Sequence, residues 1–234
     1  MECSIVPGSL SQYRVFLYIP VSNNTPLVGF AGSPWTVANY MLEGKGKTDF
    51  NYSKKFLYQN RELTKELVNF ITEKTINHLI GQIKAGADII QLFDSWAGIL
   101  GNNEYNDLVI DPTKKIVRSL KQKFPDIPII GFPRNSGFLY ESYITKTGID
   151  VIGVDQFTPI NKMHQWQENI VVQGNLDPVI LLTDKDTIAY KVNELLSNIS
   201  LNNFIFNLGH GILPQTPIEN VEFLIQQVRS FNAK

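Results

Sequence analysis

Six short apolar runs, each ended by a polar or glycine residue, recur along the chain after its first two dozen residues. They consist almost entirely of Val, Ile, Leu and Phe, without the polar alternation of a strand that has one face in water. Runs of this kind are typical of strands buried on both faces. The predicted strands cover residues 26–30, 89–93, 127–132, 151–154, 170–173 and 204–208.

Longer stretches with helical spacing of apolar residues separate these runs. They predict helices over residues 61–85, 113–124 and 184–198. The apolar stripe of the first helix comprises Leu63, Leu67, Phe70, Ile71, Leu79, Ile80 and Ile83. A fourth helix begins at Thr216-Pro217-Ile218-Glu219, which has the form of a capping box with Thr216 as N-cap. Its predicted core stripe is Val221, Leu224, Ile225 and Val228.

The alternation of strand and helix predicts parallel β/α units, and so an α/β fold. The pattern alone fits either an open doubly wound sheet or a barrel, and six strands are fewer than the eight of a closed β/α barrel. No linker or change in composition divides residues 26–234. Residues 1–25 do not share the pattern of the rest, and we treat them as an atypical N-terminal segment.

Composition narrows the range of functions. The 234 residues carry 21 Lys and Arg against 22 Asp and Glu, so no basic surface for nucleic acid or an anionic membrane is expected. Cys3 is the single cysteine, which excludes an internal disulfide framework. No apolar run reaches the ~20 residues of a membrane span, and the first residues lack a signal-peptide pattern. We therefore expect a cytoplasmic protein.

Polar residues follow the predicted strands, where β/α folds carry their reactive groups. These segments are residues 31–35, 94–98, 133–136, 155–156, 174–178 and 209–211. A polar pocket at one rim of the sheet is therefore expected. Each position also has a structural explanation, because glycines form turns and Asp94 or Asp177 could simply cap a helix.

His210, flanked by two glycines at a strand end, is the histidine that we expect to act at this rim. Arg134 also lies at a strand end, where it could meet either a bound carboxylate or a surface acid. Ser95 lacks the G-x-S-x-G elbow of a nucleophilic hydrolase. The scattered His and Cys residues do not make a zinc site, and residues 43–47 lack the spacing of a phosphate loop.

Four separated segments resemble the uroporphyrinogen decarboxylase family, and they follow the family's order. They are Pro26-Leu27-Val28-Gly29-Phe30-Ala31-Gly32-Ser33-Pro34-Trp35-Thr36 with Tyr40-Met41-Leu42-Glu43-Gly44, Gln91-Leu92-Phe93-Asp94-Ser95-Trp96-Ala97-Gly98, Gln173-Gly174-Asn175-Leu176-Asp177-Pro178 and Asn207-Leu208-Gly209-His210-Gly211. The resemblance covers residues 26–234. It implies a TIM-type (β/α)8 barrel, here truncated to about six β/α units. It also implies a homodimeric carboxy-lyase of porphyrin and haem biosynthesis that uses no metal or organic cofactor.

The implied reaction removes the carboxyl groups from the four acetate arms of uroporphyrinogen III and gives coproporphyrinogen III. By the resemblance, Tyr40, Ser95 and His210 bind this substrate. Their hydroxyl and imidazole groups can donate hydrogen bonds to carboxylates. Without a cofactor, a protonated pyrrole of the substrate takes up the electrons released with carbon dioxide, and the protein positions and stabilises that cation.

Two features of the family are missing from these 234 residues. One is an arginine-rich R-Q-A-G-R-Y segment that binds substrate carboxylates, and the other is an aspartate that stabilises the cation, so no catalytic residue is assigned here. Gln156 stands where the family commonly has an aromatic residue. Six strands would leave two open edges. We expect an isolated chain to be poorly soluble, to associate, or to need a separately made N-terminal piece.

Two other functions remain open. The first is a non-catalytic fragment that at most binds porphyrin-like ligands, which coproporphyrinogen formation by the chain alone would exclude. The second is a related barrel methyltransferase for corrinoid or thiol substrates. Such relatives hold zinc with His and Cys ligands, which a chain with one cysteine matches poorly, and tightly bound stoichiometric zinc would favour this reading.

Overall fold

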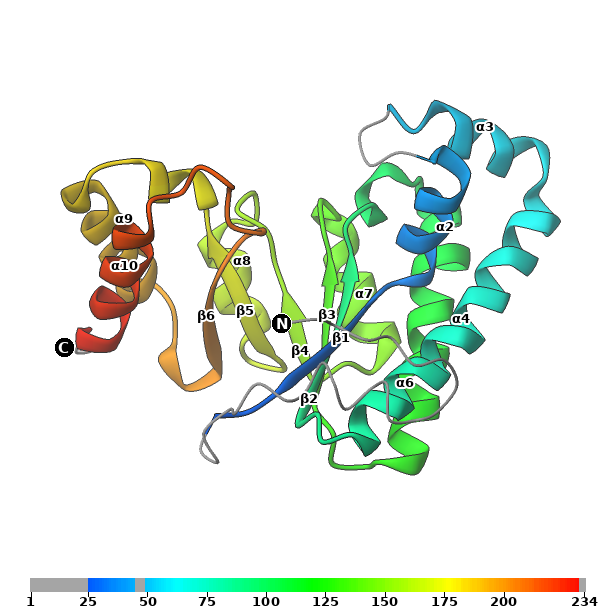
Figure 1. Ribbon diagram of the computed structural model, residues 1–234, viewed down its shortest axis with the longest axis horizontal. Coiled ribbons are helices and arrows are strands. Elements are labelled where there is room, and N and C mark those ends of the chain that lie inside the picture. The colour runs from blue at the N-terminus through cyan, green and yellow to red at the C-terminus, as the bar shows by residue number, and fades with distance from the viewer. Residues whose placement is uncertain (1–24, 45–48, 232–234) are drawn as a thin grey trace, which may run out of the picture.

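Six strands form one parallel sheet in the computed structural model, which describes residues 25–44 and 49–231 (Figure 1). The strands are β1 (Val28–Gly32), β2 (Ile89–Asp94), β3 (Ile129–Pro133), β4 (Val151–Gly153), β5 (Val171–Leu176) and β6 (Phe204–Leu208), so all six predicted strands are confirmed. They lie side by side in chain order. A doubly wound sheet reverses its strand order at a switch point, so this order is that of a β/α barrel.

Helices connect the strands and cover the outside of the sheet. They are α2 (Pro34–Glu43), α3 (Asn51–Gln59), α4 (Arg61–Lys84), α5 (Asn102–Tyr105), α6 (Asp111–Lys123), α7 (Tyr140–Thr147), α8 (Ile160–Trp166), α9 (Lys185–Ser197) and α10 (Ile218–Ser230). Figure 1 shows α2, α4 and α6 beside the first three strands, and α9 and α10 beside the last two. None of the helices in the described residues is both long enough and apolar enough to cross a membrane.

The main core lies between the outer face of the sheet and these helices. Ile90, Leu92 and Ile129 are fully buried there, together with Leu79 of α4 and Leu120 of α6. Because successive strand residues point to opposite faces, the residues between them point to the inside of the curved sheet. The outer layer therefore holds the strands in register, and the inner face is left for a site.

The sheet is curved but not closed. Within the described residues, β1 pairs only with β2, and β6 pairs only with β5. Inner-face side chains are exposed at both edges, with Phe30 of β1 60% exposed and Ile205 of β6 38% exposed. All residues of β3 and β4, in the middle of the sheet, are buried. The two outer strands thus present unpaired backbone groups and apolar side chains, as the edges of an incomplete barrel do.

The predicted apolar stripe of α4 is partly wrong. Leu63 and Phe70 are 53% and 59% exposed, whereas Thr64 and Thr72 are buried. Each threonine hydroxyl donates to the carbonyl four residues earlier, at 3.0 Å from Thr64 to Asn60 and 2.7 Å from Thr72 to Val68. A hydroxyl satisfied within its own helix can be buried at low cost, so the buried face is set by shape as well as by hydropathy.

The predicted capping box at the start of α10 is wrong. Pro217, not Thr216, is the N-cap residue, and Thr216 Oγ1 has no hydrogen-bond partner. The helix start is fixed instead by Asn220, whose Nδ2 donates to the carbonyls of Leu181 and Thr183 at 3.0 Å each. Ile225 of the predicted stripe is 44% exposed.

Five helices of the described residues were not predicted, namely α2, α3, α5, α7 and α8. Other predictions fall outside the described residues. These are the atypical N-terminal segment up to Asn24 and the 45–47 part of the segment compared with a phosphate loop. Gly44, which is described, ends α2 in the left-handed conformation (φ 65°), a position that favours glycine.

Candidate functional site

The carboxyl ends of the six strands meet at one rim, and a cavity of about 190 Å³ opens inside the curved sheet near it. It is lined from five strands by Gln91, Phe93, Phe132, Val154, Gln173, Asn207, Leu208, His210 and Gly211. Phe93 packs edge-on against Phe30 and Phe132, with ring centroids 5.8 and 6.0 Å away. The cavity therefore has an apolar, aromatic floor with polar groups above it, as small-molecule sites commonly do.

Two buried glutamines are the functional candidates that the sequence analysis missed. Gln91 of β2 and Gln173 of β5 are 8% and 6% exposed and line the cavity. Gln91 interrupts an otherwise apolar run, and Gln173 ends one. A polar residue inside a strand buried on both faces is itself a signal, because burying an amide is costly unless it meets a partner.

His210 reaches the cavity from the end of β6. Gly209 is required before it, since a Cβ there would lie 2.3 Å from the backbone nitrogen of Gln156, whereas a Cβ on Gly211 would meet nothing within 4 Å. Partial burial lowers the pKa of His210, the charge of Arg134 lowers it further, and Asp155 opposes both. The lowered pKa favours the neutral imidazole, which has one N–H to donate.

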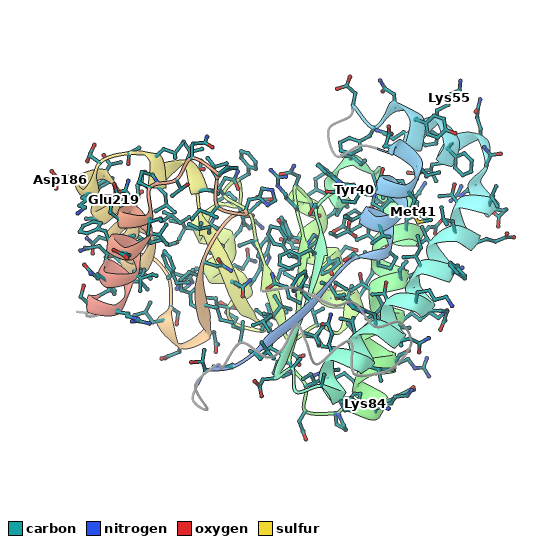
Figure 2. The ribbon with its side chains drawn as sticks, viewed as in Figure 1. Tyr40, Met41, Lys55, Lys84, Asp186 and Glu219 are labelled. Atoms are coloured by element: carbon teal, nitrogen blue, oxygen red, sulfur yellow. The ribbon has the colours of Figure 1, made fainter. Side chains whose placement is uncertain are left out.

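Tyr40 and Ser95 lie on the opposite side of the rim, on α2 and directly after β2. Tyr40 is 47% exposed, and its ring packs edge-on against Trp96 with centroids 6.2 Å apart. Figure 2 shows Tyr40 and Met41 on α2, at the same end of the molecule as the ends of the strands. The structure places these residues and His210 at one rim. Neither Tyr40 nor Ser95 lines the described cavity, and neither contacts His210.

Asp94 ties the two elements that carry Tyr40 and Ser95 together. It is 1% exposed, and its Oδ1 accepts a hydrogen bond of 2.6 Å from Thr36 Oγ1 of α2. The same hydroxyl accepts the N–H of Trp96 at 3.2 Å. Burial raises the pKa of Asp94 to about 7, although the bond from Thr36 opposes the shift. Asp94 therefore does not cap a helix but links α2 to the end of β2.

Asp155, after β4, has a structural role. Its carboxylate accepts hydrogen bonds from Asn135 N (2.6 Å), Tyr140 Oη (3.0 Å), Phe157 N (3.1 Å) and Thr158 Oγ1 (3.4 Å). Four donors saturate the carboxylate and fix the end of β4 to the segment after β3. This arrangement leaves Asp155 no free lone pair for catalysis.

Two further strand-end residues are also structural. Asn175 Nδ2 donates to the carbonyls of Asp155 and Thr158, at 3.2 and 2.8 Å. Asp177 caps the short helical turn that follows β5 by accepting the N–H of Val179 at 2.9 Å. The capping explanation for Asp177 is therefore confirmed.

A second hollow, of about 560 Å³, lies outside the sheet beside α7 and α8. Phe138, Phe157 and Trp166 are among its lining residues, and the ion pair between Lys162 and Glu141, 2.9 Å long, lies beside it. It is larger than the inner cavity, and Asn135 and Asp155 at strand ends also line it, but His210 and the buried Gln91 and Gln173 line the inner cavity. We therefore take the inner cavity as the candidate site. No group of three or more His, Cys, Asp or Glu side chains that could hold a metal occurs in the described part of the chain.

A family model described as "Uroporphyrinogen decarboxylase (URO-D)" matches residues 17–231. The uroporphyrinogen decarboxylase of Rickettsia bellii (strain RML369-C) is 60% identical over 211 residues, which are 90% of this chain and 62% of that protein. That of Rickettsia africae (strain ESF-5) is 59% identical over 208 residues, 89% of this chain and 60% of that protein. The chain thus spans about 60% of the length of these relatives.

Solved structures with the same fold are more distant in sequence. A methyltransferase from Methanosarcina mazei superposes with a TM-score of 0.75 at 20% identity, covering 94% of this chain and 63% of that one. A B12-independent methionine synthase from Shewanella sp. W3-18-1 gives a TM-score of 0.63 at 15% identity, covering 97% and 66%. At these identities the likeness concerns the fold alone.

Proposed function

The chain belongs to the uroporphyrinogen decarboxylase family, and from this we propose that it carries much of the active site of an enzyme that converts uroporphyrinogen III to coproporphyrinogen III. The observation that carries the proposal is the convergence of the family-like strand ends. Segments far apart in the sequence, around Tyr40, Ser95 and His210, come to one rim of one sheet. A β/α barrel places its chemistry at that rim.

The proposed role of these residues is to bind carboxylates. The substrate presents carboxylate groups around a macrocycle of four pyrroles, and hydroxyl or imidazole N–H donors suit them. The aromatic floor formed by Phe93 and Phe132 suits the apolar face of a tetrapyrrole. Gln91 and Gln173 can donate to the substrate's polar edge, and neutral His210 can donate one hydrogen bond.

The proposed chemistry needs the substrate itself as the electron sink. Protonation of a pyrrole makes it able to accept the electron pair of the breaking carbon–carbon bond, and carbon dioxide leaves. The family resemblance assigns stabilisation of that cation to an aspartate that these 234 residues do not contain. In our proposal this chain therefore supplies orientation and carboxylate binding, while the cation is stabilised from the missing part of the barrel.

We further propose that two more strands close the sheet between β6 and β1. Both edges are unpaired within the described residues and expose inner-face side chains such as Phe30 and Ile205. An eight-stranded sheet would cover them. The family resemblance supports a homodimer in the cytoplasm for the completed enzyme, with no cofactor.

Turnover of uroporphyrinogen III tests this function. The chain would be assayed alone and with the N-terminal part of the Rickettsia bellii relative joined ahead of residue 26, and the products separated by their number of carboxyl groups. We expect partly and fully decarboxylated products from the joined protein and little or none from the chain alone. Absence of any product from a folded joined protein would refute the proposal.

A second candidate function is binding of tetrapyrrole carboxylates without turnover. It is favoured by the absence of the arginine-rich segment and the aspartate, while the rim residues are retained. Binding of uroporphyrin III to the chain, with no turnover even in the joined protein, would support this candidate over the enzyme.

A further inference from the structure

We propose that the Arg134 guanidinium binds a carboxylate of the ligand at the rim that it shares with His210, an inference that rests on the proposed function. Sequence analysis left Arg134 open between a bound carboxylate and a surface acid. The structure favours the bound carboxylate on three grounds, which are the direction of the residue, its lack of a partner and its position relative to His210.

The alternation of β3 directs Arg134 to the inner face. A Cβ on Gly131 would lie 2.6 Å from the Tyr143 ring of α7, so that position faces the helices. Phe132 faces inward and lines the cavity, and Arg134 follows it by two residues. The backbone of Arg134 is held on both sides, because its N–H donates to Asp94 O at 3.0 Å and its carbonyl accepts from Gly98 N at 3.1 Å.

The guanidinium has no acid partner within the described residues. Its Nε is buried without a hydrogen-bond partner, and none of the six ion pairs given by the structure includes it. Asp155 is close enough to influence His210, but four protein donors already occupy its oxygens. A buried charged donor left unpaired is costly, and a bound anion would satisfy it.

Arg134 and His210 act on each other electrostatically. Arg134 and His210 follow different strands, β3 and β6, at the same rim, and the positive charge of Arg134 lowers the pKa of His210. A carboxylate between them would accept charge-assisted hydrogen bonds from the planar guanidinium and one from the imidazole. The class of ligand is therefore an organic carboxylate, such as an acetate or propionate arm.

The test compares Arg134→Gln with Arg118→Gln, which removes an exposed arginine of α6. The probe is uroporphyrin III, the stable oxidised form of the proposed substrate, and affinity is read from quenching of tryptophan fluorescence. We expect Arg134→Gln to weaken binding roughly tenfold or more, Arg134→Lys to weaken it less, and Arg118→Gln to leave it unchanged. Unchanged affinity in a folded Arg134→Gln protein would overturn the proposal.

A second readout separates this inference from the proposed function. Glutarate, a simple dicarboxylate, would be titrated into the wild-type chain while the arginine Nε–H and histidine ring signals are followed by NMR. We expect saturable shifts at Arg134 and His210 but not at Arg118. If uroporphyrin does not bind but glutarate shifts the Arg134 signal, the proposed tetrapyrrole ligand is wrong and the proposed carboxylate site is retained. If neither ligand affects Arg134, the site is refuted.

Discussion

Replacing Asp94 by asparagine should remove a pH dependence of stability that originates in one buried carboxyl group. Asp94 is 1% exposed, and only one of its oxygens has a partner, Thr36 Oγ1 at 2.6 Å. Asparagine keeps that acceptor and the shape of the side chain. It removes the ability to ionise, so the two proteins differ chiefly in the charge that the wild type acquires as the pH rises.

The magnitude follows from the raised pKa of Asp94. Its value of about 7 in the fold lies above the ordinary value of 3.8, so the protonated form is favoured in the native state. The stability that this group contributes is fully present below pH 3.8 and is lost as the pH rises to about 7. At about 1.36 kcal/mol per pH unit, the loss is on the order of 4 kcal/mol.

The assay is urea unfolding followed by circular dichroism, from pH 5 to pH 8.5. At pH 5 we expect the variant to be no more stable than the wild type, since the amide buries two unpaired N–H donors and the neutral carboxyl group one O–H. Between pH 5 and pH 8 the difference should move in favour of the variant by about 3 kcal/mol, because only about two pH units of the loss lie between pH 5 and the pKa of about 7. Asp126→Asn, at an exposed position, is the control substitution. A difference between Asp94→Asn and the wild type that is flat with pH, or a variant that is less stable at pH 8, would refute the reasoning.

Three further predictions use matched pairs. Gly209→Ala should lower the unfolding free energy by about 1–3 kcal/mol, because the new Cβ would lie 2.3 Å from Gln156 N. Gly211→Ala should cost little, since a Cβ there meets nothing within 4 Å, and equal costs in thermal unfolding would contradict this. Asn220→Ala should lower the unfolding free energy by about 1–3 kcal/mol, because the hydrogen bonds to the carbonyls of Leu181 and Thr183 are lost. Thr216→Ala, whose hydroxyl has no partner, should change the free energy of urea unfolding by less than about 0.5 kcal/mol. In the joined, active protein, Tyr40→Phe and His210→Ala should each raise the activation free energy of turnover by about 1.5–3 kcal/mol. Wild-type rates in both variants would remove these residues from the site.

The sheet could be predicted from the sequence because its strands are buried on both faces. Six continuous apolar runs had few alternative interpretations, and each became a strand. Helices α2 and α3 were missed because apolar residues such as Tyr40, Met41, Tyr52 and Tyr58 lie on their exposed sides and obscure the helical period. The capping box failed because a tertiary contact of Asn220 determined where α10 begins.

The rim of the site could be predicted from the rule that β/α folds carry chemistry at strand ends. That rule located His210, Ser95 and Arg134 but could not tell which strand-end residues are structural. Asp155 and Asn175 proved to be saturated by local hydrogen bonds, which depend on segments that the sequence does not show to be neighbours. The glutamines Gln91 and Gln173 were missed because they lie within the strands.

The measurement that tests the central claim most directly is amide hydrogen exchange of the chain with and without uroporphyrin III. The claim is that the ligand lies against the inner rim and not in the larger hollow beside α7 and α8. We expect slower exchange in residues 91–96 and 207–211, with residues 137–147 and 156–166 unchanged. Protection confined to residues 137–147 and 156–166, or protection nowhere, would contradict the account.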